Sequence, residues 1–282
     1  MSGANAGLAV TTRGLVHVYR TEGQDVAALA GVDLSIGPGE MVGLLGPSGS
    51  GKSTLLALLG GLMRPSAGRI LVGGQDLAEL ADAQVDAYRA TEVGILLQGA
   101  RRNLVPYLTV AENVAFAQAS ARRAGKTGTA PSAREALELV QVAELADALP
   151  AALGPGQAQL CALAVALSAR PGLLLADEPS ASLSATARDH VLAAIAGVNS
   201  AWGTTVIVVT HDAAVAAGMR RTITIRHGRV GGQGRGGEEF AVVAADGSLP
   251  LPLAALADLP PGSAVHVLRA GDRWVLVPES EG

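Results

Sequence analysis

One glycine-rich segment constrains this chain more than any other feature. It follows an apolar run at residues 41–45 and precedes a second apolar run at residues 55–59. In order, its residues are Gly46, Pro47, Ser48, Gly49, Ser50, Gly51, Lys52, Ser53 and Thr54. The pattern is G-x-x-x-x-G-K-[ST] between a predicted buried strand and a predicted helix. This order predicts a strand, a tight loop and a helix that together bind phosphate groups.

Each residue type in this segment has a physical role. Glycines allow consecutive backbone N–H groups to turn inward around a polyphosphate, and the helix N-terminus adds its positive dipole end. Lys52 would reach the β- and γ-phosphates, and the Ser53 hydroxyl would hold Mg²⁺. The alternative is a chance glycine-rich turn, and the residues described next argue against it.

Two further aliphatic runs end in polar residues. Residues 173–176 precede Asp177 and Glu178, and residues 206–209 precede Thr210 and His211. Continuous aliphatic runs are typical of parallel strands covered on both faces, whose carboxyl ends form the ligand site of an α/β sheet. We expect Asp177 to hold Mg²⁺. We expect Glu178 to orient and deprotonate a water molecule that attacks the bound γ-phosphate. The alternative is a strand that ends in an ordinary acidic turn.

Three more side chains are candidates for the same site. His211 stands at a strand end, where it could hydrogen-bond a γ-phosphate; a lone histidine is otherwise an ordinary surface residue. Gln98 follows the predicted strand 93–97 and could reach Mg²⁺ and the attacking water. Tyr19 could stack on a base, since aromatic stacking contributes ~1–3 kcal/mol. The alternative for Tyr19 is an ordinary strand aromatic.

Composition excludes several other classes. The net charge of −4 gives no basis for wrapping nucleic acid. The single cysteine, Cys161, excludes an internal disulfide. No run of about 18 apolar residues occurs, so we expect a soluble chain that meets a membrane only through a partner.

The spacing of apolar residues becomes helical from about residue 108 to 149, and capping boxes are predicted at Thr109/Glu112 and Ser132/Glu135.

Together these motifs resemble the nucleotide-binding subunit of an ABC transporter over roughly residues 8–230. Residues 46–54 match the Walker A motif, and residues 173–178 match the Walker B motif. Three single residues match further motifs of the family: Gln98 matches the Q-loop, His211 the switch histidine and Tyr19 the A-loop aromatic. Residues 60–68, and Tyr88-Arg89 before Val93-Gly94, resemble the macrolide-efflux and lipoprotein-release branch.

The resemblance implies an α/β fold: a P-loop ABC ATPase core, with a mixed sheet and a helical subdomain at about 98–160, and a small C-terminal β module. It further implies ATP and Mg²⁺ as cofactors, a second ABC ATPase subunit in a homo- or heterodimer, and no nucleic-acid partner. A membrane permease subunit would hold the chain at the cytoplasmic face of the membrane. A soluble ABC protein acting on ribosomes or DNA is disfavoured, because the chain has one cassette and no long coiled-coil insertion.

The signature motif departs from the family pattern. The family's L-S-G-G-Q stands here as Leu153, Gly154, Pro155, Gly156 and Gln157. Gly156 and Gln157 remain as ATP-binding candidates, whereas a hydroxyl donor and a backbone N–H donor to the opposite subunit's γ-phosphate are lost. The arginine that usually follows the signature is Leu160, and the D-loop aspartate is Ser184. The alternative function is therefore a weak or inactive ATPase paired with an intact second subunit.

The C-terminal part forms a segment of its own in this interpretation. Residues 231–237 are predicted to be a glycine-rich linker, and residues 238–282 a small β-rich module. The order of a strand, D-G-x-L-P, a short helix, L-x-P-G and two strands resembles the swapped-hairpin fold of bacterial transition-state regulators. Residues 238–281 carry two arginines against seven acidic residues, which disfavours DNA binding. We therefore expect a module for dimerisation or regulation, or simply a β appendage packed on the core.

Overall fold

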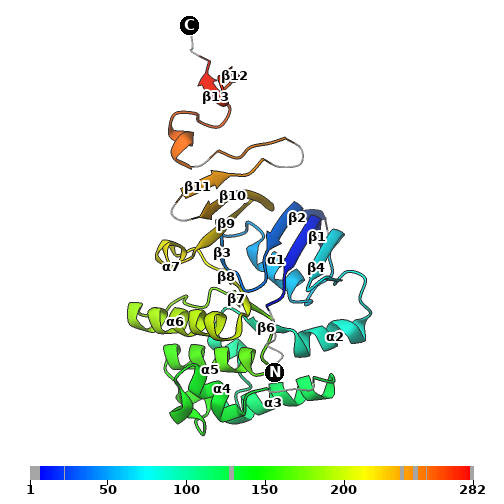
Figure 1. Cartoon of the computed structure of the whole chain (residues 1–282), viewed down its shortest axis with the longest axis vertical. Coiled ribbons are helices and arrows are strands. Elements are labelled where there is room, and N and C mark those ends of the chain that lie inside the picture. The colour runs from blue at the N-terminus through cyan, green and yellow to red at the C-terminus, as the bar shows by residue number, and fades with distance from the viewer. Residues whose placement is uncertain are drawn as a thin grey trace.

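The core of the protein is a seven-stranded mixed sheet (Figure 1). A computed structural model describes residues 7–21, 23–126, 130–235, 238–243, 247–251 and 253–279. The strand order is β11-β10-β9-β3-β8-β7-β6. The bounds are β3 Met41–Leu45, β6 Val93–Leu96, β7 Leu173–Asp177, β8 Thr205–Val209, β9 Arg221–Arg226, β10 Arg229–Arg235 and β11 Glu238–Ala241.

The central strands are parallel and covered on both faces, as their aliphatic runs predict. β3 pairs in parallel with β8 and β9, and β7 pairs in parallel with β8 and β6. Alternate side chains enter different clusters: Leu173 and Leu175 pack with α1 (Lys52–Leu59), whereas Leu174 and Ala176 pack with α5 (Pro155–Leu167) and α6 (Ala185–Trp202). This alternation follows from the two-residue period of a strand. The parallel pairing of β7 with β8 places their carboxyl ends beside each other.

A second, antiparallel sheet lies beside this core. Its strand order is β2-β1-β4-β5, and β1 pairs with both β2 and β4. The bounds are β1 Val10–Thr21, β2 Gln24–Ile36, β4 Ala67–Val72 and β5 Gln75–Asp76. Its apolar side chains share a cluster with α1 and β3, so this sheet covers the face of α1 that the core sheet leaves open.

The predicted helical region forms a separate layer at one end of the molecule (Figure 1). It contains α3 Val110–Arg123, α4 Ala133–Leu139 and short 3-10 turns, and it follows α2 Asp82–Thr91 and β6. Both predicted capping boxes are confirmed: the Thr109 and Ser132 hydroxyls accept from the N–H groups of Glu112 and Glu135, whose carboxylates accept in return. Of the loop predicted after α3, residues 127–129 lie outside the described residues.

Lys126 ties this region to the core. Its ammonium donates to the backbone carbonyl of Thr91 at the end of α2, and to that of Arg170 after α5 at 3.2 Å. Burial lowers the pKa of Lys126, while the nearby Glu92 raises it in part. A positive charge near the C-terminal ends of α2 and α5 is favourable because those ends carry partial negative charge.

The predicted linker over residues 231–237 is wrong for residues 231–235. These belong to β10, which pairs with β9 on one side and with β11 on the other. The pairing with β9 is close here: a Cβ on Gly234 would lie 2.3 Å from the Thr222 hydroxyl oxygen, so a larger residue would require the Thr222 side chain to move. Residues 236 and 237 lie outside the described residues. β11 therefore extends the core sheet, although the prediction assigned residues 238–241 to the C-terminal module.

Past β11, the described residues contain a short 3-10 turn at Leu253–Ala257 and a two-stranded antiparallel sheet. Its strands are β12 Val265–Ala270 and β13 Arg273–Pro278. Among the described helices, which include α7 Ala213–Ala217, none is long and apolar enough to cross a membrane.

Candidate nucleotide-binding and catalytic site

The loop between β3 and α1 has the conformation that its glycines predict. Gly46 and Gly51 have φ angles of 142° and 102°, in the region that side chains avoid. A Cβ on Gly46 would lie 2.1 Å from the Ile225 carbonyl oxygen, and one on Gly51 would lie 2.4 Å from the Ala28 carbonyl oxygen. Only glycine fits at either position. Helix α1 begins at Lys52 without a side-chain cap, so its first backbone N–H groups stay available to an anion.

The Lys52 side chain is buried inside this loop. Its ammonium donates to the carbonyl oxygens of Gly46 at 2.9 Å and Pro47 at 2.8 Å. The charge is therefore held by neutral acceptors at the site predicted to bind phosphates. A phosphate oxygen is a stronger acceptor for an ammonium than a neutral carbonyl.

Asp177, at the end of β7, is a buried carboxylate beside this loop. Burial raises the pKa of Asp177 above its ordinary value; the hydrogen bond with the Ser53 hydroxyl lowers it, nearby Glu178 raises it and Lys52 lowers it. Its Oδ1 atom is buried and has no hydrogen-bond partner in the described part of the chain. A carboxylate oxygen and a hydroxyl at a phosphate site are ligands that Mg²⁺ prefers. The predicted pair of Mg²⁺ ligands thus lies together, with an unsatisfied charge that a cation would neutralise.

Glu178 and His211 meet at the carboxyl ends of β7 and β8. Glu178 Oε1 lies 2.7 Å from His211 Nδ1, although 33 residues separate them in the sequence. The Glu178 backbone has a φ of 48°, which is uncommon for a non-glycine residue, and its N–H donates to the Val209 carbonyl at 2.9 Å. Strained backbone of this kind occurs at functional sites, where surrounding structure holds a side chain in a required direction.

Tyr19 lies next to the phosphate loop but on the antiparallel sheet. Its hydroxyl is 3.2 Å from the Thr54 hydroxyl and 3.6 Å from the Met63 sulfur. The side chain is 40% exposed, and its ring packs edge-on against His17. The part of the ring left open is available to a base, which is the role predicted for it.

Gln98 lies past the end of β6 and is exposed. Its loop is braced by Asn103, a residue that the sequence reasoning missed. Asn103 Oδ1 accepts from the Leu97 N–H at 2.8 Å, and Asn103 Nδ2 donates to the Leu97 carbonyl at 2.9 Å. The only sequence signal for this brace is an asparagine five residues after Gln98. Asparagine is common in loops of every kind, so this signal does not predict the contact.

The signature segment forms the N-terminus of α5. Gly154 is the N-cap of this helix, and Pro155 is its first residue. The first N–H of a helix has no partner within the helix, so the proline removes no helical hydrogen bond. Gln157 Oε1 accepts from the Gly154 N–H at 3.0 Å, and a Cβ on Gly156 would lie 2.9 Å from the Ala187 Cβ. A groove of about 340 Å³ runs between these residues and the start of α6, lined by Leu160, Ser184, Thr186 and His190 among others.

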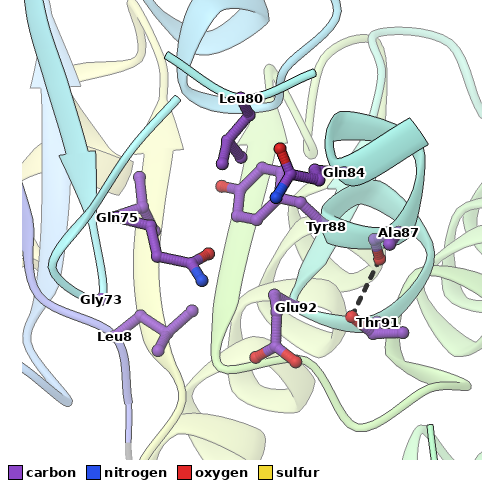
Figure 2. Close-up of a pocket in the computed structure, with 10 residues that line it drawn as sticks. Leu8, Gly73, Gln75, Leu80, Gln84, Ala87, Tyr88, Thr91 and Glu92 are labelled. Atoms are coloured by element: carbon purple, nitrogen blue, oxygen red, sulfur yellow. Dashed lines mark hydrogen bonds between the residues drawn. The ribbon is translucent and has the colours of Figure 1, made fainter. Parts of the chain in front are cut away.

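A larger cavity, of about 440 Å³, lies elsewhere, between α2 and the β4–β5 turn (Figure 2). Gln75, Gln84 and Glu92 line it together with Tyr88, whose hydroxyl donates to the Leu59 carbonyl at 2.7 Å. Its lining includes none of the predicted site residues.

Comparison with known proteins decides the family. The sequence profile of the family described as "ABC transporter" matches residues 29–181. The chain belongs to the ABC transporter ATP-binding family. Its fold and its motifs agree with this membership, and as a member it is an ATPase subunit that binds ATP. The expected fold class and activity are confirmed.

Several relatives are similar over most of their length. "Lipoprotein-releasing system ATP-binding protein LolD 1" of Caulobacter vibrioides is 36% identical over 221 residues, covering 78% of this chain and 94% of the relative. A LolD protein of Chromohalobacter salexigens is 37% identical over 227 residues, covering 80% and 94%. The predicted resemblance to the lipoprotein-release branch is confirmed.

Solved structures give the same result. The dimeric, post-hydrolysis form of the ATP-binding cassette MJ0796 with ADP and Pi superposes with a TM-score of 0.73 at 32% identity, covering 80% of this chain and 98% of that one. A second dimeric MJ0796 structure gives a TM-score of 0.72 with the same coverage.

Proposed function

We propose that this chain hydrolyses ATP at a site built from its phosphate loop, Asp177, Glu178 and His211, and that the reaction powers a lipoprotein-release type of permease. The observation that carries the proposal is the Glu178–His211 contact of 2.7 Å, at the strand edge where Lys52 and Asp177 also lie. Residues distant in the sequence meet there, which supports a site for phosphoryl transfer to water.

Phosphate binding rests on the loop amides and Lys52. The backbone N–H groups of Gly49, Ser50, Gly51, Ser53 and Thr54 would surround the β- and γ-phosphates, with Gly46 and Ser48 shaping the turn. Lys52 would exchange its two carbonyl acceptors for phosphate oxygens. Tyr19 would stack on the adenine, with its hydroxyl held near Thr54.

Asp177 and Ser53 would hold Mg²⁺, with Gln98 reaching the same ion. When bound, Mg²⁺ supplies positive charge that neutralises the charge developing on the phosphate oxygens. The unpartnered Asp177 Oδ1 supports this role.

Glu178 would act on the attacking water. The water oxygen forms the new bond to the γ-phosphorus, the bond to the ADP oxygen breaks, and Glu178 orients the water and accepts its proton. His211 Nδ1 lies 2.7 Å from Glu178 Oε1, and His211 would position this carboxylate toward the γ-phosphate.

A second subunit would complete each site. Its signature segment, equivalent to Gly154, Pro155, Gly156 and Gln157 here, would face the γ-phosphate bound by this chain. The dimeric solved structures of MJ0796 support two-subunit assembly. We place the assembly at the cytoplasmic face of the membrane, bound to the permease.

A second candidate function is favoured by one observation. Gly154 offers no hydroxyl and Pro155 offers no backbone N–H, at two positions that would face the opposite subunit's ATP. The chain would then be a weak ATPase that works with a second, intact ABC ATPase subunit.

Two variants separate binding from hydrolysis. Glu178→Gln keeps the shape of the side chain but removes the proton acceptor, so it should retain ATP and lose phosphate release. Lys52→Ala should lose ATP binding itself. Equilibrium binding of a fluorescent ATP analogue and steady-state phosphate release measure the two effects. Undiminished phosphate release by Glu178→Gln would assign the water-activating role to another residue.

A further inference from the structure

The polar contacts of Tyr19 fix its side chain at a single atom. The hydroxyl oxygen lies 3.2 Å from the Thr54 hydroxyl in the first turn of α1 and 3.6 Å from the Met63 sulfur. This oxygen lies on the axis that runs from Cβ through the ring, so contacts at the oxygen leave rotation about that axis free. The rotation is the second side-chain torsion of tyrosine, whose preferences are broad. A second contact is therefore needed to set the direction in which the ring presents its faces.

His17 supplies a contact that lies away from this axis. The centroids of the two rings are 4.8 Å apart, and the ring planes meet at 82°. An edge-on arrangement of this kind is a preferred geometry of aromatic pairs, and it is favourable beyond the area that the pair buries. Rotation of the Tyr19 ring about its own axis would break the arrangement, so the contact with His17 selects one orientation of the ring.

His17 is itself held by the strand that carries it. β1 pairs with β2 on one side and with β4 on the other, and the His17 side chain is 8% exposed. Beside it, the Val18 N–H donates to the Ser66 hydroxyl at 3.0 Å, and the Ser66 N–H donates to the Val16 carbonyl at 2.9 Å. A buried side chain on a paired strand orients a neighbour more precisely than a side chain on a loop.

A nitrogen of His17 is left without a partner by this burial. The Nδ1 atom is buried and accepts or donates no hydrogen bond in the described part of the chain. A buried polar atom without a partner destabilises a fold. Leucine at this position would remove that loss together with the aromatic edge, whereas phenylalanine would remove the loss and keep the edge. These two substitutions therefore separate the role of the ring from the role of its nitrogens.

We propose that His17 is a positioning residue for nucleotide binding, because it holds the Tyr19 ring in the orientation that stacks on the adenine. The inference rests on the proposed stacking role of Tyr19 and adds a residue that acts through it. His17 and Tyr19 are two positions apart on β1 and project from the same face of the sheet. The Tyr19 side chain is 40% exposed, which leaves part of the ring open to a base. A ring that is oriented before the base arrives loses less freedom on binding, which favours affinity.

Binding of ADP and of inorganic pyrophosphate to the full-length chain tests the proposal. Both probes carry the diphosphate that the phosphate loop would bind, but only ADP carries adenine. With Mg²⁺ present, His17→Leu should raise the Kd of ADP about fivefold in titration calorimetry and leave the Kd of pyrophosphate within about twofold. His17→Phe should return the Kd of ADP to within about twofold of the wild-type value, because the aromatic edge is restored.

Two further variants serve as controls. Val18→Ala alters the adjacent residue on the opposite face of β1, and it should change neither Kd by more than about twofold. Tyr19→Leu removes the ring that His17 would position. In that background, His17→Leu should have no additional effect on the Kd of ADP, since residues that act as a unit are not additive.

The motion of the Tyr19 ring gives a readout that a purely structural role of His17 would not change. The chain has three tyrosines, so selective carbon-13 labelling of tyrosine rings gives a simple spectrum. We expect His17→Leu to speed up rotation of the Tyr19 ring in relaxation measurements, and His17→Phe to leave it slow. Tyr88 is buried and donates to the Leu59 carbonyl, so its ring serves as an internal reference.

Three outcomes would overturn the proposal. The first is equal weakening of ADP and pyrophosphate binding by His17→Leu, which would make the role of His17 structural. The second is a failure of His17→Phe to restore ADP binding, which would assign the role to a nitrogen of His17. The third is an unchanged Kd of ADP in His17→Leu. Failure of the proposed function looks different, because the wild-type chain would then bind neither ADP nor pyrophosphate.

Discussion

Restoring the signature motif should raise the rate of ATP hydrolysis. The change is Gly154→Ser together with Pro155→Gly. A Cβ on Gly154 would meet only Gln157 Oε1, at 3.4 Å, and the backbone there is extended with φ −66° and ψ 160°. A serine therefore fits without strain, and serine is also a preferred N-cap residue.

The effect on folding should be small compared with the effect on turnover. Serine in place of glycine at an N-cap contributes a few tenths of a kcal/mol, and glycine in place of proline at the first helical turn costs roughly 0.4–1 kcal/mol. Each restored donor to a γ-phosphate contributes ~1.5–3 kcal/mol, because its acceptor is charged. If that energy is expressed in the transition state, one donor accelerates turnover roughly 10- to 150-fold.

The assay is steady-state phosphate release with the permease present, since each site is completed by an opposite subunit. The single variants Gly154→Ser and Pro155→Gly separate the hydroxyl from the backbone N–H. Adding Glu178→Gln to the restored variant should abolish the gain, which excludes a contaminating ATPase. Melting temperatures of all variants show whether the fold is kept.

An unchanged rate in a homodimer would refute the reasoning that the signature limits hydrolysis. If a second, distinct ATPase chain co-purifies with the permease, the fast site is the one in which this chain's Walker motifs face that chain's signature. Restoration would then act only on the slower site, and the total rate would rise little. The composition of the purified complex therefore decides which expectation applies.

Two further predictions concern stability. Asp177→Asn should raise the melting temperature without ligand at neutral pH but lose the stabilisation by Mg²⁺ and ATP. The folded-state pKa of Asp177 is raised, so the wild type loses stability as pH rises from the unfolded-state pKa through the folded-state pKa. The variant should lack this pH dependence, which scanning calorimetry over a series of pH values measures. Lys126→Met should lower the free energy of unfolding by about 1–3 kcal/mol, because the carbonyls of Thr91 and Arg170 lose a charged donor; urea denaturation measures it, and a change below about 0.5 kcal/mol would contradict the contact.

The sequence predicted the parts of the site that depend on local pattern. The phosphate loop lies between a strand and a helix because glycines, a lysine and flanking apolar runs act within about twenty residues. The capping boxes at Thr109 and Ser132 are likewise local and are present. The carboxyl-end positions of Asp177 and His211 followed from their aliphatic runs.

The C-terminal part shows where such reasoning fails. A glycine-rich segment is typical of a linker, yet residues 231–235 form a strand because β9 offers them a partner edge. The composition of this segment indicates that it is flexible in isolation. It does not show that a neighbouring strand will pair with the segment and fix its conformation. Similarly, the brace of Asn103 on Leu97 depends on a loop conformation that no local pattern specifies.

The sequence by itself determined which side chains are candidates to bind phosphate, hold a cation or accept a proton, and that they follow strands of one sheet. Only the tertiary structure decided how these groups meet. It placed Glu178 2.7 Å from His211, left Asp177 Oδ1 buried without a hydrogen-bond partner, and gave Lys52 two carbonyl acceptors. The reason is physical: residue type and spacing fix local conformation, whereas distances and desolvation depend on the order in which β3, β8 and β7 pair.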